Sequence, residues 1–524
     1  MRAGILIACL AGVLSVAQGG SPPAQSAPER GLPEHAAPAP PAAPGRPSGE
    51  RPDPNAAELE AELGRFLGVY STAAENSADP LSPDQVIYGG AIPGMLRVLD
   101  PHSVFFDQDQ FEQLQQMQHS VSKGFGSVVS VLPGRVIVLQ TQPGSPSQRA
   151  GLLPGDEILG VNGIPLARLD FEQLIQLLGA SRQHPARLVV RRQGTAGLLN
   201  FTMVPAEMQA DSVDRIYRID DETSYARITS FEARTAEQLK KAIEKLGGTK
   251  LKALVLDLRE NPGGSVAAGL ETASLFLPSG TRLLSIRGRS SNTENVEVPA
   301  GAQPYRFKLA VLVNERTASA AEIVAGALQD NDRATLAGMP TFGKGLVQHV
   351  FPLSEATGLA LTTAFYYAPS GRSLQKPLHG GELDEATRTP VRSEFKTASG
   401  RTVRGGGGIE PDILASPQLP GRFALFLDES ALYTAFATDW LGRHRAEVKR
   451  DLEITPAILD EFQLFLSQRD VRPSVSDWTA ERERMRSRLK QEILNQSLGV
   501  EAGDEIEVRR DPLMRRALEQ LAAQ

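Results

Sequence analysis

The sequence predicts an α/β protein with several domains. A chain of 524 residues is too long for one hydrophobic core. Two short apolar runs rich in branched residues, 253–258 and 309–313, each precede a helical pattern, which is typical of parallel strands buried on both faces. Helical periodicity also dominates the last hundred residues or so. These patterns divide the chain into six segments: 1–17, 18–55, 56–122, 123–207, 208–420 and 421–524.

Residues 1–17 have the pattern of a secretory signal, with one early arginine, an apolar run over residues 5–16 and a small residue, Ala17, at the expected cleavage site. We therefore expect export, to the bacterial periplasm or cell envelope. The alternative is a lipoprotein signal, because Cys9 follows Leu-Ile-Ala, although the apolar region before Cys9 is very short. Cys9 is the only cysteine, so a processed chain would have no disulfide and no cysteine metal site.

Composition separates the next two segments. Eleven prolines lie between Ser21 and Asn55 among Ala, Ser and Gly, so residues 18–55 are expected to form an extended, disordered tether. From Ala56 the apolar residues fall on one face of a helix. The residues on this face are Leu59, Leu63, Phe66, Leu67 and Tyr70.

The net charge of −7 and the lack of a basic run argue against nucleic acid as a partner.

The segment 56–122 also contains a turn signal with a histidine, Asp100-Pro101-His102-Ser103. His102 suggests catalysis, but a hydrogen-bonded histidine in a turn is the simpler interpretation. The other histidines lie in neither a G-x-S-x-G nor an H-E-x-x-H context, which argues against a hydrolase elbow and a zinc protease.

Residues 123–207 are rich in short strands and glycine turns, and they contain AGLLPGDEILGVNG at 150–163. This segment resembles a PDZ domain. Its carboxylate-binding loop would be Gly124, Phe125, Gly126 and Ser127, whose N–H groups can point at a peptide's terminal carboxylate while the next strand pairs with the peptide. A helix at 169–178 would form the other wall of the groove.

Ser319 is expected where the strand 309–313 turns into a helix, beside N–H groups that favour negative charge. Together with Glu322 it also matches an ordinary capping box. Lys344 lies between two glycines, and it can serve as a base only when neutral, which requires burial or cationic neighbours. Residues 338–344 imitate the start of a phosphate-binding loop, but Gly345 stands where Ser or Thr would hold magnesium, and a strand follows.

Three stretches, 318–323, 326–330 and 341–348, resemble the active-site region of the C-terminal processing peptidases, also called tail-specific proteases. The resemblance implies that Ser319 is the nucleophile, Lys344 its general base and Gln348 the residue that orients the lysine. Glu322 and Asp330 also match positions that support the site in that family. The resemblance further implies a crotonase-like core built of ββα units.

Two more motifs match the same family. DLRENPGG at 257–264 would supply one oxyanion-hole N–H from Gly263 or Gly264, and the residue after the nucleophile, Ala320, would supply the other. Residues 94–103 resemble the GML…LDPHS signature that precedes the PDZ domain. We expect neither a metal nor a cofactor, since no metal-ligand cluster is visible in the sequence.

The remaining segments have less distinctive patterns. Residues 376–405 resemble a polar insertion without an assignable role. In the C-terminal segment the charges alternate in sign, so a mostly solvated surface is expected. Helices are predicted at 423–440, 456–466 and 478–494, with a last one that Asp511 caps and Pro512 begins.

The sequence therefore predicts an exported serine endopeptidase with a Ser-Lys dyad and a PDZ domain that receives the free C-termini of protein or peptide substrates. The alternative is a catalytically inactive PDZ-containing scaffold or chaperone. A homo-oligomer and an adaptor protein both stay open as partners. Cleavage of an unfolded protein would separate the enzyme from the scaffold.

Overall fold

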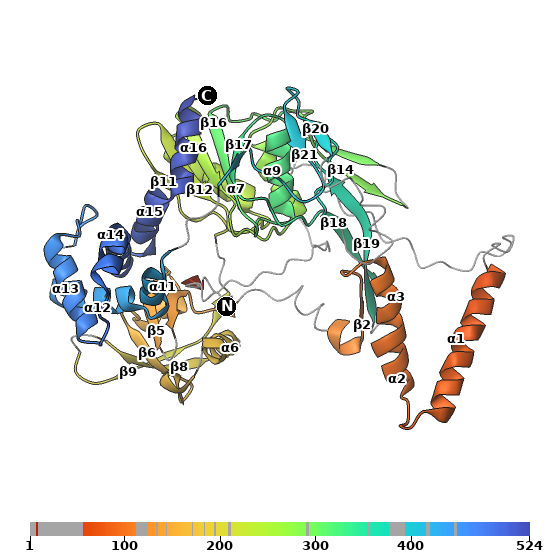
Figure 1. Cartoon of the computed structure of the whole chain (residues 1–524), viewed down its shortest axis with the longest axis horizontal. Helices are drawn as coiled ribbons and strands as arrows, with labels where there is room; N and C mark the ends of the chain where they lie inside the picture. Colours follow the sequence, from red (N-terminus) through yellow and green to blue (C-terminus); the bar gives the residue numbers. More distant parts are fainter. Residues whose placement is uncertain are drawn as a thin grey trace, which may run out of the picture.

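The computed structural model places a central α/β unit between two smaller parts (Figure 1). A unit of short strands and the C-terminal helices lie at one side of this centre, and helices α1 to α3 lie at the other. The linker predicted at 18–55 and most of the predicted signal at 1–17 lie outside the described residues. The structure describes residues 7–8, 56–111, 123–132, 135–142, 144–169, 171–182, 184–192, 195–207, 211–289, 293–354, 357–376, 393–415, 420–444 and 448–523.

The central unit is built on a sheet with the order β11-β12-β13-β16-β17-β22, in which every pair is parallel except β11 with β12. The two apolar runs of the sequence form β13 and β16, which confirms both predicted strands. They are neighbours in the sheet. The strands are β11 (Tyr217–Arg218), β12 (Thr223–Arg227), β13 (Ala253–Asp257), β16 (Lys308–Val313), β17 (Thr335–Gly338) and β22 (Ile413–Leu414).

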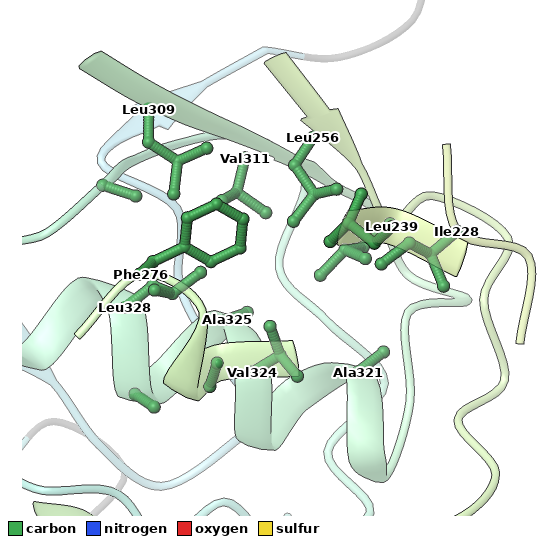
Figure 2. Packing of buried hydrophobic residues seen from close by; sticks show 14 of the residues in the cluster. Ile228, Leu239, Leu256, Phe276, Leu309, Val311, Ala321, Val324, Ala325 and Leu328 are labelled. Atoms are coloured by element: carbon green, nitrogen blue, oxygen red, sulfur yellow. The ribbon is translucent and has the colours of Figure 1, made fainter. Parts of the chain in front are cut away.

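Both faces of this sheet are covered, which explains the continuous apolar runs. Leu256, Leu309 and Val311 point to one face and pack with residues of helix α9, as Figure 2 shows. Alternate residues, such as Val255 and Leu312, point to the other face, where they pack with residues of α15 and α16. The helices on the first face are α7 (Thr235–Leu246), α8 (Val266–Ser274) and α9 (Ala320–Asp330).

A second sheet carries the strand that follows Lys344. Its order is β15-β14-β19-β18, and β2, from the N-terminal part of the chain, pairs with β19. Part of the predicted polar insertion forms a separate hairpin of β20 (Glu394–Lys396) and β21 (Thr402–Arg404). The strands of the second sheet are β2 (Val104–Phe106), β14 (Arg282–Gly288), β15 (Glu294–Glu297), β18 (Leu346–Pro352) and β19 (Gly358–Tyr367).

The strand-rich unit that follows residue 122 has a sheet with the main order β1-β4-β5-β6-β8-β9 around its own apolar core. A separate pair, β3 with β10, joins the two ends of this unit. Its elements are β1 (Ile7–Ala8), β3 (Lys123–Gly124), β4 (Ser127–Leu132), β5 (Arg135–Thr141), α5 (Pro146–Ala150), β6 (Glu157–Val161), β7 (Ile164–Pro165), α6 (Phe171–Ser181), β8 (Ala186–Arg191), β9 (Leu199–Met203) and β10 (Ala206–Glu207).

The N-terminal helices expose much of their apolar surface. The predicted helix from Ala56 is present, but Leu59 and Leu67 on its apolar face are each 60% exposed. No helix among the described residues is long and apolar enough to cross a membrane. The helical elements are α1 (Ala56–Asn76), α2 (Pro83–Val86), a π-helical turn (Ile87–Ala91) and α3 (Ile92–Leu99).

The C-terminal region is helical but differs from the sequence prediction in two respects. The single helix predicted at 423–440 is wrong, because the chain breaks at Ala431, whose φ is 52°. The sequence analysis also missed α15. The helices are α11 (Arg422–Glu429), α12 (Leu432–His444), α13 (Pro456–Ser467), α14 (Val475–Leu498), α15 (Val500–Arg510) and α16 (Pro512–Ala523).

The prediction of a mostly solvated surface for these helices does not extend to one buried charged cluster. Arg488 and Glu492 are only 7% and 6% exposed. Arg488 Nε donates to Asp428 at 2.9 Å, so its charge is compensated by a carboxylate from another helix. These helices also join two parts of the molecule: the N–H of Val500 bonds to the side chain of Gln140 on β5, while α16 covers the central sheet.

Candidate active site

Ser319 lies at the turn between β16 and α9. Thr317 Oγ1 donates to the carbonyl oxygen of Leu258 at 2.8 Å, and this bond ties the turn to the neighbouring strand end. The backbone of Ser319 has φ 56° and ψ −120°, which a residue with a side chain adopts only when its surroundings enforce it. Its half-buried side chain is therefore held in one place, next to the first N–H groups of the helix.

Glu322 is a fully buried carboxylate that connects the serine with the lysine. Its Oε2 accepts the N–H of Ser319 at 2.9 Å and that of Lys344 at 2.8 Å. Its Oε1 accepts the N–H of Gly343 at 2.7 Å and the hydroxyl of Thr341 at 2.5 Å. Because one oxygen binds both N–H groups, the backbones of Ser319 and Lys344 must be neighbours. Burial raises the pKa of Glu322 above its ordinary value, against the opposing effect of these four donors.

We expect Glu322→Gln to damage both stability and activity. A glutamine has only one acceptor oxygen, so its NH2 group would face two of the four donors and leave them unpaired in the interior. The free energy of unfolding should fall by about 1–3 kcal/mol, and the turnover rate should fall at least about tenfold because the two N–H groups on Oε2 set the site's geometry.

The matched control for this prediction is Glu260→Gln. Glu260 pairs with Arg316 at the surface beside the same turn, where both side chains are more than half exposed. The unfolding free energy of this variant should change by less than about 0.5 kcal/mol. Chemical denaturation and a peptide-cleavage assay measure the two effects. Equal behaviour of the two variants would contradict the role of Glu322.

The glycines of the loop before α8 approach the serine closely. A Cβ atom on Gly263, whose φ is 99°, would lie 2.8 Å from Ser319 Cβ, so only glycine fits there. A Cβ atom on Gly264 would lie 2.2 Å from the carbonyl oxygen of Phe231. Gly263 is therefore required by the packing of this loop against the serine, and Gly264 by its packing against Phe231.

These glycines differ in how they could act as oxyanion donors. The N–H of Gly263 donates to Asn261 Oδ1 at 2.8 Å, so it is already used. In the described part of the chain no acceptor takes the N–H of Gly264 or of Ala320. Of the alternatives in the sequence analysis, Gly264 with Ala320 is therefore the pair with available N–H groups.

Lys344 is half-buried, just before β18, and Gln348 lies exposed on that strand. The amide nitrogen Nε2 of Gln348 donates to the carbonyl oxygen of His102 at 2.9 Å. Among the described residues, no hydrogen bond joins Lys344 Nζ to Ser319 Oγ or to Gln348. The structure thus brings the backbones of Ser319 and Lys344 together through Glu322, while the side chain of Gln348 contacts His102. The catalytic roles of all three residues stay predictions.

Asp330 lies away from this region. It is at the C-terminal end of α9, whereas Ser319 precedes the N-terminal end. Its carboxylate forms a fully buried ion pair with Arg372 at 2.6 Å and also accepts the N–H of Ser370 at 3.0 Å. Asp330 therefore anchors the loop after β19 and does not contact the predicted catalytic residues.

Two positioning residues were missed in the sequence analysis. Thr341 donates to Glu322 and accepts the N–H of Ile409 at 2.7 Å, while Asn261 supports the glycine loop through Gly263 and donates to the carbonyl oxygen of Ile228 at 2.9 Å. Both belong to motifs quoted above. Their fully buried polar side chains would have been the signal, but burial is not visible in the sequence.

The Asp-Leu-Arg part of the glycine motif forms a buried charged network. Asp257 accepts from Arg259 Nη2 at 2.6 Å and from the Tyr225 hydroxyl at 2.7 Å. Arg259 also pairs with Asp511, at the start of α16, at 2.5 Å. The arginine guanidinium holds the pKa of Asp257 below its ordinary value although burial opposes this. The C-terminal region thus contacts the base of the glycine loop.

The predicted carboxylate-binding loop, Gly124 to Ser127, leads directly into β4. The carbonyl oxygens of Phe125 and Gly126 accept the N–H groups of Ser147 and Gln142 at 2.9 and 2.7 Å, and these bonds fix the backbone of the loop. One edge of β4 pairs with β5, and the opposite edge pairs antiparallel with Ile7–Ala8. The opposite edge therefore accepts an extended segment.

No group of three or more His, Cys, Asp or Glu that could hold a metal occurs in the described part of the chain.

Family models match two regions of the chain. Residues 222–385 match the peptidase family S41, and residues 137–192 match the PDZ domain. The first match covers the glycine loop, Ser319, Lys344 and Gln348. The second match covers the core of the strand-rich unit.

Several relatives and a solved structure are similar over much of the chain. A carboxy-terminal-processing protease of Bartonella bacilliformis is 35% identical over 69% of this chain and 77% of its own. A carboxyl-terminal-processing protease of Synechocystis sp. is 33% identical over 60% and 74%. The structure of a photosystem II D1 C-terminal processing protease is 25% identical over 70% of this chain and 92% of its own, with a TM-score of 0.40. On the relatives' identity and coverage, the chain belongs to the carboxyl-terminal processing proteases of peptidase family S41, and it carries a PDZ domain.

Proposed function

We propose that this chain is an exported serine endopeptidase that cleaves peptide bonds through an acyl-enzyme. In the first step Ser319 Oγ attacks the scissile carbonyl carbon while Lys344 takes the hydroxyl proton. The C–N bond then breaks and the lysine returns the proton to the leaving amine. Water hydrolyses the ester in the second half of the reaction, again with the lysine as base.

The observation that carries this proposal is the shared oxygen of Glu322. It binds the N–H of Ser319 and the N–H of Lys344, so a single buried group holds the backbones of the proposed nucleophile and base next to each other. The N–H groups of Gly264 and Ala320 would stabilise the oxyanion. Gln348 would orient the neutral amine of the lysine.

The proposed fold details and localisation rest on further observations. Parallel strands β12, β13 and β16 are each followed by a helix on one face, and this pattern supports the crotonase-like core of ββα units. Helices α11 to α16 would be a C-terminal extension of that core. The signal-like residues 1–17 support export, with the lipoprotein alternative at Cys9 still open.

The proposal is tested by incubating the full chain with an unfolded test protein that has a free C-terminus. We expect internal peptide bonds to be cleaved, with fragments identified by mass spectrometry. Binding of the test protein without any cleavage would instead favour the alternative, an inactive PDZ-containing scaffold or chaperone.

Recognition of substrate C-termini gives a separate prediction. If the N–H groups of the loop Gly124 to Ser127 bind a terminal carboxylate, amidation of a peptide's C-terminus should weaken its binding by about 1.5–3 kcal/mol, because charge-assisted hydrogen bonds are lost. Calorimetry with paired free and amidated peptides on the Ser319→Ala variant measures this difference. Equal affinity for both peptides would remove the carboxylate-binding role from this loop.

A further inference from the structure

The turn at Asp100 to Ser103 has no assigned role, yet it touches a predicted catalytic residue. The carbonyl oxygen of His102 accepts the amide Nε2 of Gln348 at 2.9 Å. A carbonyl oxygen only accepts hydrogen bonds, so it must face the NH2 end of the amide. The orientation of Gln348 is thereby determined, and its acceptor atom Oε1 is left at the other end.

The carbonyl group of His102 is itself held in a fixed direction. Asp100 is 1% exposed, and its Oδ1 accepts the N–H of His102 at 2.7 Å and the N–H of Ser103 at 2.8 Å. The N–H of Ser103 and the carbonyl of His102 belong to the same trans peptide unit, so they point in opposite directions. By binding the N–H on one side, Asp100 aims the carbonyl oxygen at Gln348 on the other.

The turn is also fastened to the sheet at the level of Gln348. Ser103 Oγ donates to Asp100 Oδ2 at 2.6 Å and accepts the N–H of Thr362 at 3.3 Å. Thr362 is the register partner of Gln348 on the neighbouring strand. Strand β2 follows directly and pairs with β19. Neither the turn nor the glutamine can therefore shift without disturbing the other.

We propose that Asp100 and the peptide unit between His102 and Ser103 are positioning groups for catalysis, because they keep the Oε1 end of Gln348 available to Lys344. This inference rests on the proposed function. A neutral lysine that aims its lone pair at Ser319 must donate its own N–H bonds elsewhere, and an amide oxygen is a suitable acceptor. In the opposite amide orientation Gln348 would present its NH2 group to Lys344, and this donor could not accept the N–H bonds of the lysine.

The test combines Asp100→Ala with Gln348→Ala. Each single variant should lower kcat on the order of ten- to a hundredfold, by the loss of orientation, with little change in KM. The double variant should be no slower than Gln348→Ala alone, because both changes remove the same function. Losses that multiply in the double variant would overturn the inference, and so would an Asp100→Ala enzyme with the kcat of the unmodified chain.

Two control variants separate positioning from general damage. His102→Ala keeps the backbone carbonyl, so its kcat should stay within about twofold of the unmodified chain. Asp100→Asn keeps an oxygen for both N–H groups, so it should restore most of the activity that Asp100→Ala loses. A damaging His102→Ala would assign the effect to the imidazole and overturn the inference.

Ser103→Ala serves if Asp100→Ala does not fold, because it keeps both backbone hydrogen bonds of Asp100. Ser103→Ala should lower kcat less than Asp100→Ala does, and this loss should disappear when Gln348 is also replaced by alanine. A loss that persists in that double variant would contradict the inference. If Gln348→Ala alone leaves kcat unchanged, the role of the glutamine in the proposed function fails as well. If Gln348→Ala lowers kcat but its effect multiplies with those of the variants in the turn, only this inference is overturned.

Discussion

Ser319→Ala is expected to abolish peptide-bond cleavage, with a loss on the order of a million-fold in kcat, since the nucleophile is removed. The fold should persist, because alanine keeps the backbone N–H that binds Glu322. Because the fold persists, peptide binding by the PDZ domain should be unchanged. Single-turnover cleavage of an unfolded protein, with circular dichroism as the check on folding, measures both parts.

A serine that only begins a helix provides the control. Ser474 caps α14, where its hydroxyl accepts the N–H of Asp477 at 3.1 Å. Ser474→Ala should therefore cost about 1 kcal/mol of stability and leave turnover intact. If Ser319→Ala behaved like Ser474→Ala, or retained more than about a hundredth of the turnover, Ser319 would be a helix cap and the nucleophile would lie elsewhere.

Lys344→Arg should also be inactive, with a loss of about 10²- to 10⁴-fold, the usual contribution of a general base. The guanidinium of arginine does not release its proton in proteins, so the variant keeps the charge but loses the base. Single-turnover cleavage rates of both enzymes test this.

Lys376 offers a matched control in the same region. Its side chain packs beside Gly343, and its Nζ donates to the carbonyl oxygen of Thr341 at 3.1 Å. Lys376→Arg should retain activity within about tenfold, because this lysine acts only as a hydrogen-bond donor. An active Lys344→Arg enzyme would reduce Lys344 to a fixed positive charge, and an inactive Lys376→Arg enzyme would make Lys376 a candidate for the base.

The sequence was sufficient for the parts of the site that depend on neighbouring residues. Ser319 at a junction of strand and helix follows from an apolar run and the helical pattern after it. This is a local pattern whose backbone conformation is largely set within a few residues, whereas the close approach of Gly263 to Ser319 was not predicted. The structure places Ser319 at that junction and leaves no room for a side chain at Gly263.

The contacts that connect distant segments could not be derived in the same way. Glu322 fits a capping box in the sequence, and nothing local shows that its second oxygen binds Thr341 and Gly343. The bond between His102 and Gln348 joins segments that are far apart in the chain. The burial of Arg488 depends on Asp428 from another helix, which an alternating charge pattern does not reveal. Such pairs are fixed by tertiary packing.

The backbone of Ser319 has a consequence for the stability of this protein. A residue with a side chain at φ 56° costs roughly 1–3 kcal/mol, a substantial part of an ordinary protein's stability. Ser319→Gly should therefore raise the free energy of unfolding, because glycine adopts this conformation without the strain that a side chain brings. The position of the Ser319 hydroxyl is thus obtained at the expense of stability.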